Sequence, residues 1–237
     1  MPLFRALRLV CAAQLTRQAS SLARAAWSDT NFAQLQSLLD RPVIEDHGQA
    51  PVAAFDADGT LWSGDAFSAF TSILIKRGLL TQEECDRVAV EYAKSEEEER
   101  RVWLMESFAL FRGMRLEDLR SAADEAWDTF GPAYGPSAAQ LGGLRDTLRP
   151  EMADLVRSLR GAGWRVLIVT ASPAEAVYRG AQALGVPEGD VLAIRLETDA
   201  HGVVTGRPSA LMPLTWRDGK AAACVALGLE PSHHVQT

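Results

Sequence analysis

Apolar residues follow two patterns along this chain. Three short, mostly apolar runs are bounded by proline, glycine or charged residues, and lie at 52–55, 165–169 and 191–194. Runs of this length and composition are typical of buried strands in a parallel sheet. Between and after them, apolar positions recur at helical spacing, in 150–161, in 173–184 and from 220 onward. Strands that alternate with helices predict an α/β fold with a doubly wound parallel sheet.

The long stretch after the first strand breaks this alternation. Residues 66–130 contain no comparable strand signal. Their apolar positions recur at helical spacing, as in Phe67, Phe70, Ile73 and Leu74. We therefore expect a helical insertion, followed by a return to the sheet after the breaker cluster 131–136. Further on, 198–206 predicts a hairpin with Gly202 and Gly206 as turn residues.

The first forty residues have a different character. Residues 3–40 predict a helix that ends near Arg41-Pro42, because proline disfavours a helical conformation in the residue before it. Four arginines and no acidic residue precede Asp29, so a targeting segment is the alternative to a plain helix. No run approaches the ~18 apolar residues of a membrane span, and none is expected.

These patterns divide the chain into three parts. The N-terminal helical extension covers 1–48. The α/β core is built from 49–62 and 150–237, and the helical cap inserted into it covers 63–149.

Composition narrows the functional class. A net charge of −7 argues against a broad nucleic-acid-binding face. The three cysteines are far apart, with no CxxC pair and no disulfide framework, and the four histidines show no zinc-site spacing. We therefore expect a cytoplasmic protein that does not bind nucleic acid. The sequence gives no indication of an oligomeric state.

Two carboxylates directly follow the first strand. Asp56 and Asp58 lie where the carboxyl ends of strands in open α/β sheets bind ligands. Residues i and i+2 of an extended segment point the same way, so both can face one crevice. Like charges this close repel, and Mg²⁺ with its preference for oxygen ligands relieves the repulsion. Gly59 and Thr60 then predict a sharp turn with free backbone N–H groups suited to phosphate oxygens.

Three motifs in this order resemble those of the haloacid dehalogenase superfamily. They are F-D-A-D-G-T-L at 55–61, L-I-V-T-A-S-P at 167–173 and D-G-K at 218–220. The helical insertion after the first motif and the Thr-Gly pair at 205–206 resemble the phosphoserine-phosphatase-like branch. The resemblance covers roughly residues 50–237. It implies a Rossmann-like core with a helical cap of the C1 type.

The resemblance also implies catalytic roles. Asp56 would attack phosphorus and become an aspartyl-phosphate, and Asp58 would act as general acid and then general base. Thr170 would donate to a phosphoryl oxygen, and Lys220 would offset the negative charge. Mg²⁺ would be held by Asp56 and the backbone carbonyl of Asp58. The second aspartate favours phosphoryl transfer over dehalogenation.

Further residues are candidates for contacts with the substrate, and several of them have an alternative structural role. Phosphate contacts are expected from Gly59, Thr60, Ala171 and Ser172. Ser172 is equally suited to cap the following helix. The Thr170 hydroxyl could instead accept a hydrogen bond from a backbone N–H of the turn. Asp65 would meet an amine on the substrate, or cap the helix that starts at Ala66. Trp62 and Phe67 would line the substrate entrance, or pack the cap on the core.

The implied function is a magnesium-dependent hydrolase of a small phosphorylated metabolite, with an aminated alcohol phosphate as one candidate. The family's fourth motif is an acidic pair that completes the metal site. Only Glu230 is acidic among the 17 residues after Lys220. We therefore expect a C-terminally incomplete core that binds Mg²⁺ weakly. The alternative function is an impaired remnant that binds without catalysing.

Overall fold

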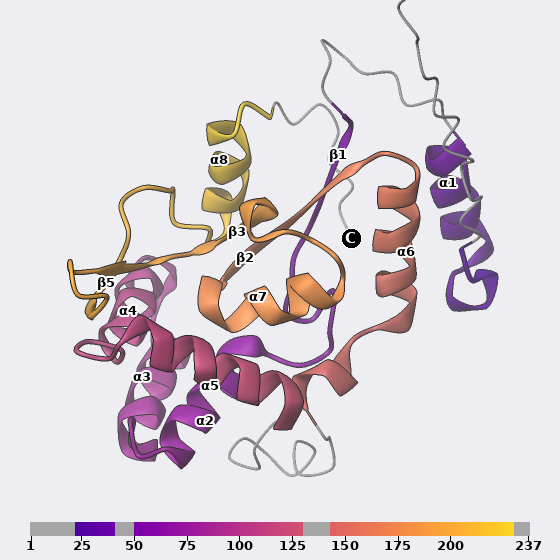
Figure 1. Ribbon diagram of the computed structural model, residues 1–237. Coiled ribbons are helices and arrows are strands. Elements are labelled where there is room, and N and C mark those ends of the chain that lie inside the picture. The colour runs from indigo at the N-terminus through magenta and orange to yellow at the C-terminus, as the bar shows by residue number, and fades with distance from the viewer. Residues whose placement is uncertain (1–21, 41–49, 130–142, 230–237) are drawn as a thin grey trace, which may run out of the picture.

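The computed structural model describes residues 22–40, 50–129 and 143–229 (Figure 1). Near the N-terminus it contains a short 3-10 turn, Arg24–Ala26, and the helix α1, Asp29–Asp40. The predicted end near Arg41-Pro42 agrees with this helix. The predicted continuous helix is wrong at 22–28, because Trp27 has an extended backbone. The start predicted at residue 3 lies outside the described residues.

Three parallel strands form the central sheet. They are β1 (Val52–Phe55), β2 (Arg165–Pro173) and β3 (Val191–Ile194), in that spatial order. The register pairs Ala54 with Leu167 and Val169 with Leu192. All three were predicted, and two have the predicted bounds. β1 lies at an edge of the sheet and pairs with β2 alone among the strands described.

Helices cover both faces of this sheet. Alternate side chains of β2 point to opposite faces, as a strand requires. Ile168 belongs to the main hydrophobic cluster, together with residues of α6 (Pro150–Gly161) and α7 (Ala174–Ala183). Leu167 and Val169 belong to a second, smaller cluster with residues of α8 (Asp218–Ala226). The core is therefore the doubly wound α/β layer structure that the alternation predicted.

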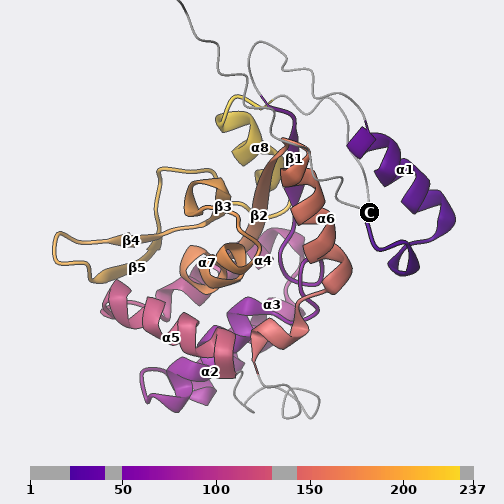
Figure 2. The ribbon, with the colours of Figure 1, turned by 45° about the vertical axis from the view of Figure 1, so that its right-hand side comes forward.

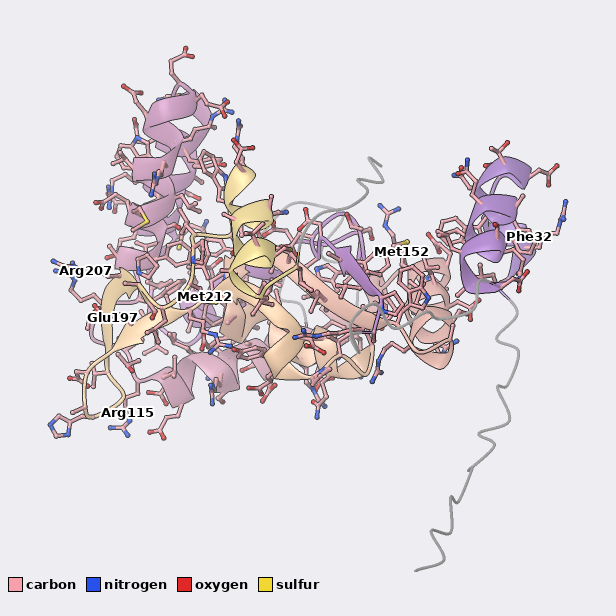
Figure 3. The ribbon with its side chains drawn as sticks, turned by 90° about the horizontal axis from the view of Figure 1, so that it is seen from above. Phe32, Arg115, Met152, Glu197, Arg207 and Met212 are labelled. Carbon is pink, nitrogen blue, oxygen red and sulfur yellow. The ribbon has the colours of Figure 1, made fainter. Side chains whose placement is uncertain are left out.

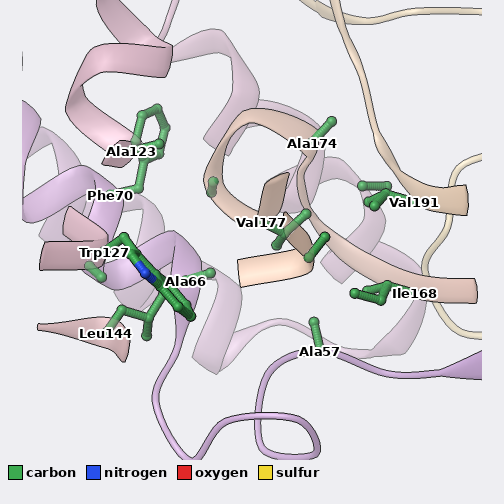
Figure 4. Packing of buried hydrophobic residues seen from close by; sticks show 14 of the residues in the cluster. Ala57, Ala66, Phe70, Ala123, Trp127, Leu144, Ile168, Ala174, Val177 and Val191 are labelled. Carbon is green, nitrogen blue, oxygen red and sulfur yellow. The ribbon is translucent and has the colours of Figure 1, made fainter. Parts of the chain in front are cut away.

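Four helices and no strand occupy the insertion between residues 63 and 129. They are α2 (Ala66–Lys76), α3 (Gln82–Lys94), α4 (Glu97–Ala109) and α5 (Leu116–Thr129). Phe70 of α2 and Trp127 of α5 share the main cluster with Ile168 and Val177 of the core (Figure 4). The insertion therefore packs directly on the α/β core.

The chain leaves and re-enters the core through two paired segments. The Ser63 N–H donates to the Thr147 carbonyl at 2.8 Å, and the Arg149 N–H donates to the Leu61 carbonyl at 2.9 Å. Thr147 ends a short 3-10 helix, Leu144–Thr147, that leads into α6. Because these backbone bonds hold the two connections side by side, the insertion starts and ends at one place.

A hairpin gives the insertion a second attachment. Its strands are β4 (Leu196–Thr198) and β5 (Val204–Pro208), and they follow β3 and the 3-10 turn Glu188–Asp190. Figure 3 shows the hairpin strand residues Glu197 and Arg207 on the opposite side of the molecule from α1. Backbone bonds join it to the segment between α4 and α5, where the Gly113 N–H donates to the Val204 carbonyl at 2.9 Å.

One detail of the hairpin prediction is wrong. Gly202 lies in the turn, but Gly206 lies inside β5. Its φ is +80°, and a Cβ there would lie 2.9 Å from the Cβ of Arg112. Gly206 is therefore suited to close approach of the helical insertion.

No described helix is long and apolar enough to cross a bilayer.

Candidate active site

Asp56 directly follows β1, at the carboxyl edge of the sheet. Its Oδ1 accepts the N–H of Ala57 at 2.9 Å, and its Oδ2 forms an ion pair with Lys220 Nζ at 2.7 Å. The Asp56 side chain is 43% exposed. Lys220 reaches it from the first turn of α8, which the D-G-K motif begins. Two segments far apart in sequence thus place an accessible carboxylate against a cation.

Asp58 lies two residues further on and is held from three sides. Its Oδ1 accepts the indole N–H of Trp62 and the N–H of Ala66, both at 2.7 Å, and its Oδ2 accepts the Ser172 hydroxyl at 2.6 Å. Burial raises the pKa of Asp58 above its ordinary value, and the charge of Asp65 raises it further. The three hydrogen bonds act in the opposite direction. Asp58 is therefore oriented, with a stronger tendency to carry a proton than an exposed aspartate.

The turn after Asp58 differs from the prediction in one respect. Gly59 has a φ of +75°, a conformation that glycine adopts without strain. The Thr60 N–H, however, donates to the Ala57 carbonyl at 3.2 Å, and the Leu61 N–H donates to the same oxygen at 2.8 Å. The amide of Thr60 was expected to be free for phosphate, and that expectation is wrong because the turn closes on itself.

The second motif lies at the carboxyl end of β2. The register between β2 and β3 shifts between Val169 and Pro173, around Thr170, Ala171 and Ser172. Such irregularities re-aim side chains and are frequent near active sites. Here the shift accompanies a Ser172 hydroxyl that reaches Asp58, on the neighbouring motif.

The structure bears on the alternatives left open for this segment. Ser172 does not cap α7, because Pro173 holds the N-cap position without a side-chain bond. The Thr170 hydroxyl oxygen accepts the Ser172 N–H at 3.1 Å, which is the turn interaction considered from the sequence. That bond uses an oxygen lone pair and leaves the hydroxyl proton available for donation.

Asp65 caps a helix in this structure. Its Oδ1 accepts the Ser68 N–H at 2.6 Å at the start of α2, and its backbone is extended as an N-cap requires. The capping interpretation is confirmed. Phe67, the second residue of α2, is half-buried and packs against Phe111 with ring centroids 6.0 Å apart.

Sequence reasoning missed the polar contacts of two buried residues. Trp62 is fully buried, packs edge-on against Trp127 at 6.1 Å between ring centroids, and donates to Asp58. Thr215 is fully buried and donates its hydroxyl to the Thr170 carbonyl at 2.5 Å. A buried tryptophan needs a partner for its N–H, so its position beside the D-x-D motif was a usable signal. Nothing in the sequence marked Thr215.

The oxygen atoms at this edge of the sheet are of the type that binds a magnesium ion. Asp56 offers a carboxylate, and Asp58 can contribute its backbone carbonyl, since its side chain is engaged. Mg²⁺ takes oxygen ligands, is often held by one or two carboxylates plus substrate phosphate, and keeps several waters. Across the described ranges, no group of three or more His, Cys, Asp or Glu side chains is arranged to hold a metal ion. Asp56 and Asp58 thus fit the ion but supply few ligands.

Comparison with known proteins identifies a matching family and structures of similar fold. The family model described as haloacid dehalogenase-like hydrolase matches residues 53–236. A protein of unknown function from Bordetella pertussis Tohama I has a similar structure, with a TM-score of 0.59 and 21% identity over 76% of this chain and 77% of that chain. A conserved, functionally unknown protein from Anaerococcus prevotii DSM 20548 gives a TM-score of 0.58 and 17% identity over 86% and 78%.

A third solved structure is also similar to this chain. A phosphoserine phosphohydrolase-like protein from Francisella tularensis subsp. tularensis SCHU S4 gives a TM-score of 0.50 and 16% identity, over 77% of this chain and 74% of that chain. No curated protein matched the sequence. The structural likenesses show a shared fold, and the family model covers most of the chain, including all three motifs. This chain belongs to the haloacid dehalogenase-like hydrolases.

Proposed function

We propose that this chain is a magnesium-dependent phosphomonoester hydrolase that works through an aspartyl-phosphate on Asp56 and acts on a small phosphorylated metabolite. The observation that carries the proposal is the accessible Asp56 carboxylate, paired with Lys220 at 2.7 Å and followed by an oriented Asp58. A nucleophile, a cation and a candidate acid–base group thus lie at one edge of the sheet.

In the first step an Asp56 oxygen attacks phosphorus, and the bond from phosphorus to the ester oxygen breaks. Asp58 gives its proton to the departing oxygen, so the alcohol leaves neutral. Lys220 offsets the charge that the nucleophile and the phosphoryl group bring together. The Thr170 hydroxyl oxygen accepts the Ser172 N–H, and its single proton is not used by that bond. Thr170 can therefore donate this proton to a phosphoryl oxygen.

In the second step water replaces Asp56 at phosphorus. Asp58, now ionised, removes a proton from that water as it attacks. Phosphate leaves and the Asp56 carboxylate is restored. Bound magnesium would supply positive charge that draws phosphoryl oxygens and the nucleophile together, with Asp56 and the Asp58 carbonyl as its ligands.

Asp65 is the candidate residue for recognition of an amine on the substrate. Asp65 uses one carboxylate oxygen to cap α2. Its other oxygen is the group that would meet an ammonium on the substrate. We retain aminated alcohol phosphates as one class to test, beside other small phosphomonoesters.

Binding without turnover is a second candidate function. It is favoured by the small number of metal ligands, since among the residues described no third acidic side chain joins Asp56 and Asp58 in a group that would hold a metal. The two candidates differ in one measurable property, the release of phosphate.

The test compares the wild-type chain with Asp56→Asn, which is isosteric and cannot attack phosphorus. With Mg²⁺ present, we expect the wild-type chain to hydrolyse an aryl phosphate, and EDTA or Asp56→Asn to abolish the hydrolysis. Circular dichroism checks that the variant is folded. Binding of vanadate, a phosphate mimic, without any hydrolysis would instead support the second candidate.

A further inference from the structure

A cavity lies between the insertion and the core, on walls that include none of the residues assigned to the active site. It has a volume of about 400 Å³, within the range of about 300–1,000 Å³ of small-molecule sites. Arg120 and Asp124 of α5 form one wall, and Glu175 and Tyr178 of α7 form the other. Figure 2 shows α5 and α7 running side by side, as they also do in Figure 1.

Glu175 in this wall is buried and incompletely bonded. The residue is only 6% exposed, and its Oε2 has no hydrogen-bond partner among the described residues. The carboxylate accepts the residue's own backbone N–H at the start of α7. Buried polar atoms normally have a partner, because leaving one unpaired destabilises the folded protein. The free oxygen therefore indicates a donor that lies outside the described residues, such as a bound ligand.

The charges around Glu175 define what that donor can be. Burial raises the pKa of its carboxyl, Arg120 and Arg195 act in the opposite direction, and Glu188 raises the pKa further. An ammonium group would satisfy the free oxygen and favour the charged form. A phosphate or other purely anionic ligand is disfavoured, because Asp124, Glu175 and Glu188 all line the cavity.

Arg120 supplies the opposite charge on the facing wall. It makes no ion pair with any residue described, although it lies close enough to influence Glu175. Arg179, also at the cavity, already donates to Gln182 at 2.7 Å. A free guanidinium binds a carboxylate through two parallel hydrogen bonds. The cavity thus presents an acceptor for an ammonium and a donor pair for a carboxylate across a space of small-molecule size.

We propose that this cavity binds a small zwitterion, of the free α-amino acid class, with its ammonium on Glu175 and its carboxylate on Arg120. The ligand would contact α5 of the insertion and α7 of the core at once. This assignment is independent of the proposed phosphatase activity, since it concerns other residues and needs no turnover.

The experiment uses isothermal titration calorimetry on the full chain, with L-serine, L-glutamine and L-arginine as probes. Acetate and ethylammonium, which carry one charge each, serve as half-probes. We expect at least one amino acid to bind. Each half-probe should bind at least about tenfold more weakly than that amino acid, because it loses one charged contact. Asp56→Asn should bind the amino acid as the wild-type chain does.

Two variants locate the binding, and a third is their control. Glu175→Gln keeps the shape of the side chain and removes its charge, and Arg120→Gln removes the guanidinium. Each should weaken binding about tenfold or more. Asp118→Asn changes an exposed acid on α5 outside the cavity and should leave binding unchanged. Melting curves without ligand show whether each variant is folded.

Three results would overturn the proposal. They are the absence of heat with every amino acid, equal binding by folded Glu175→Gln, and loss of binding in Asp56→Asn. The first would leave Glu175 with only a structural role at the start of α7. The last would place the ligand at the active site instead.

Discussion

Trp62→Phe tests whether the Trp62–Asp58 contact stabilises the fold. The substitution keeps an aromatic ring but removes the indole N–H, which lies 2.7 Å from Asp58 Oδ1. The ring is fully buried between Trp127 of α5 and Gly180 of α7. Trp62 therefore connects the insertion, the core helix and the D-x-D motif, and its loss should be felt in global stability.

The magnitude follows from two contributions. Hydrogen bonds to charged groups contribute about 1.5–3 kcal/mol, and the lower end applies because Asp58 keeps the donors Ala66 and Ser172. The smaller phenyl ring leaves a cavity that adds roughly 1 kcal/mol. Together these predict a loss of about 2.5 kcal/mol. For a domain of this size, that corresponds to a Tm about 5–10 °C lower.

Trp127→Phe is the matched control, because it removes the same ring volume from the same aromatic pair without touching Asp58. Urea denaturation of both variants gives the two free energies of unfolding. We expect Trp62→Phe to cost about 1.5 kcal/mol more than Trp127→Phe, and much of that excess to vanish when Asp58 is replaced by Ala, which removes the acceptor. Equal losses for the two variants would refute the stabilising role of the indole N–H.

Three further perturbations address packing, charge and catalysis. Gly180→Ala should lower Tm although alanine favours helices by about 1 kcal/mol, because the new Cβ would lie 2.7 Å from Trp62 Cζ3 and packed rings cannot yield cheaply; an increased Tm would contradict the packing. Glu175→Gln should gain stability relative to the wild-type chain as pH rises from the ordinary glutamate pKa through the raised folded value, because only the unfolded wild-type chain readily loses its proton in that window; parallel stability curves against pH would contradict a raised pKa. Lys220→Met should reduce aryl phosphate hydrolysis by on the order of 10² with little change in Tm, since the ion pair with Asp56 is partly exposed; an unchanged rate would remove Lys220 from the catalytic site.

Regular elements were predictable where local signals dominate. The strands 52–55 and 191–194 and the helix 150–161 have the bounds that the sequence predicted. Their edges carry proline, glycine or charged residues that end an element locally. β2 extends to Pro173, past the predicted end at Val169, because the irregular segment still pairs with β3 at Pro173. That pairing depends on a neighbouring strand and cannot be seen in the segment itself.

The candidate site was predictable in its residues but not in its hydrogen bonds. Asp56, Asp58, Thr170, Ser172 and Lys220 were named from motifs, and the structure brings the pairs Asp56–Lys220 and Asp58–Ser172 into contact. These contacts are tertiary, and the residues of the second pair are 114 positions apart in the sequence. Local sequence spacing cannot predict a contact of this kind. Glu175 was missed for the same reason, because its burial arises from the tertiary packing around α7.

The most direct test of the central claim is to look for the covalent intermediate. The wild-type chain is mixed with an aryl phosphate and Mg²⁺, quenched in acid during turnover, digested and examined by mass spectrometry. We predict one phosphoryl group on the peptide that contains Asp56, located on that residue by fragmentation and absent from Asp56→Asn. Phosphate release without this adduct, an adduct on another residue, or no release and no adduct would contradict the account.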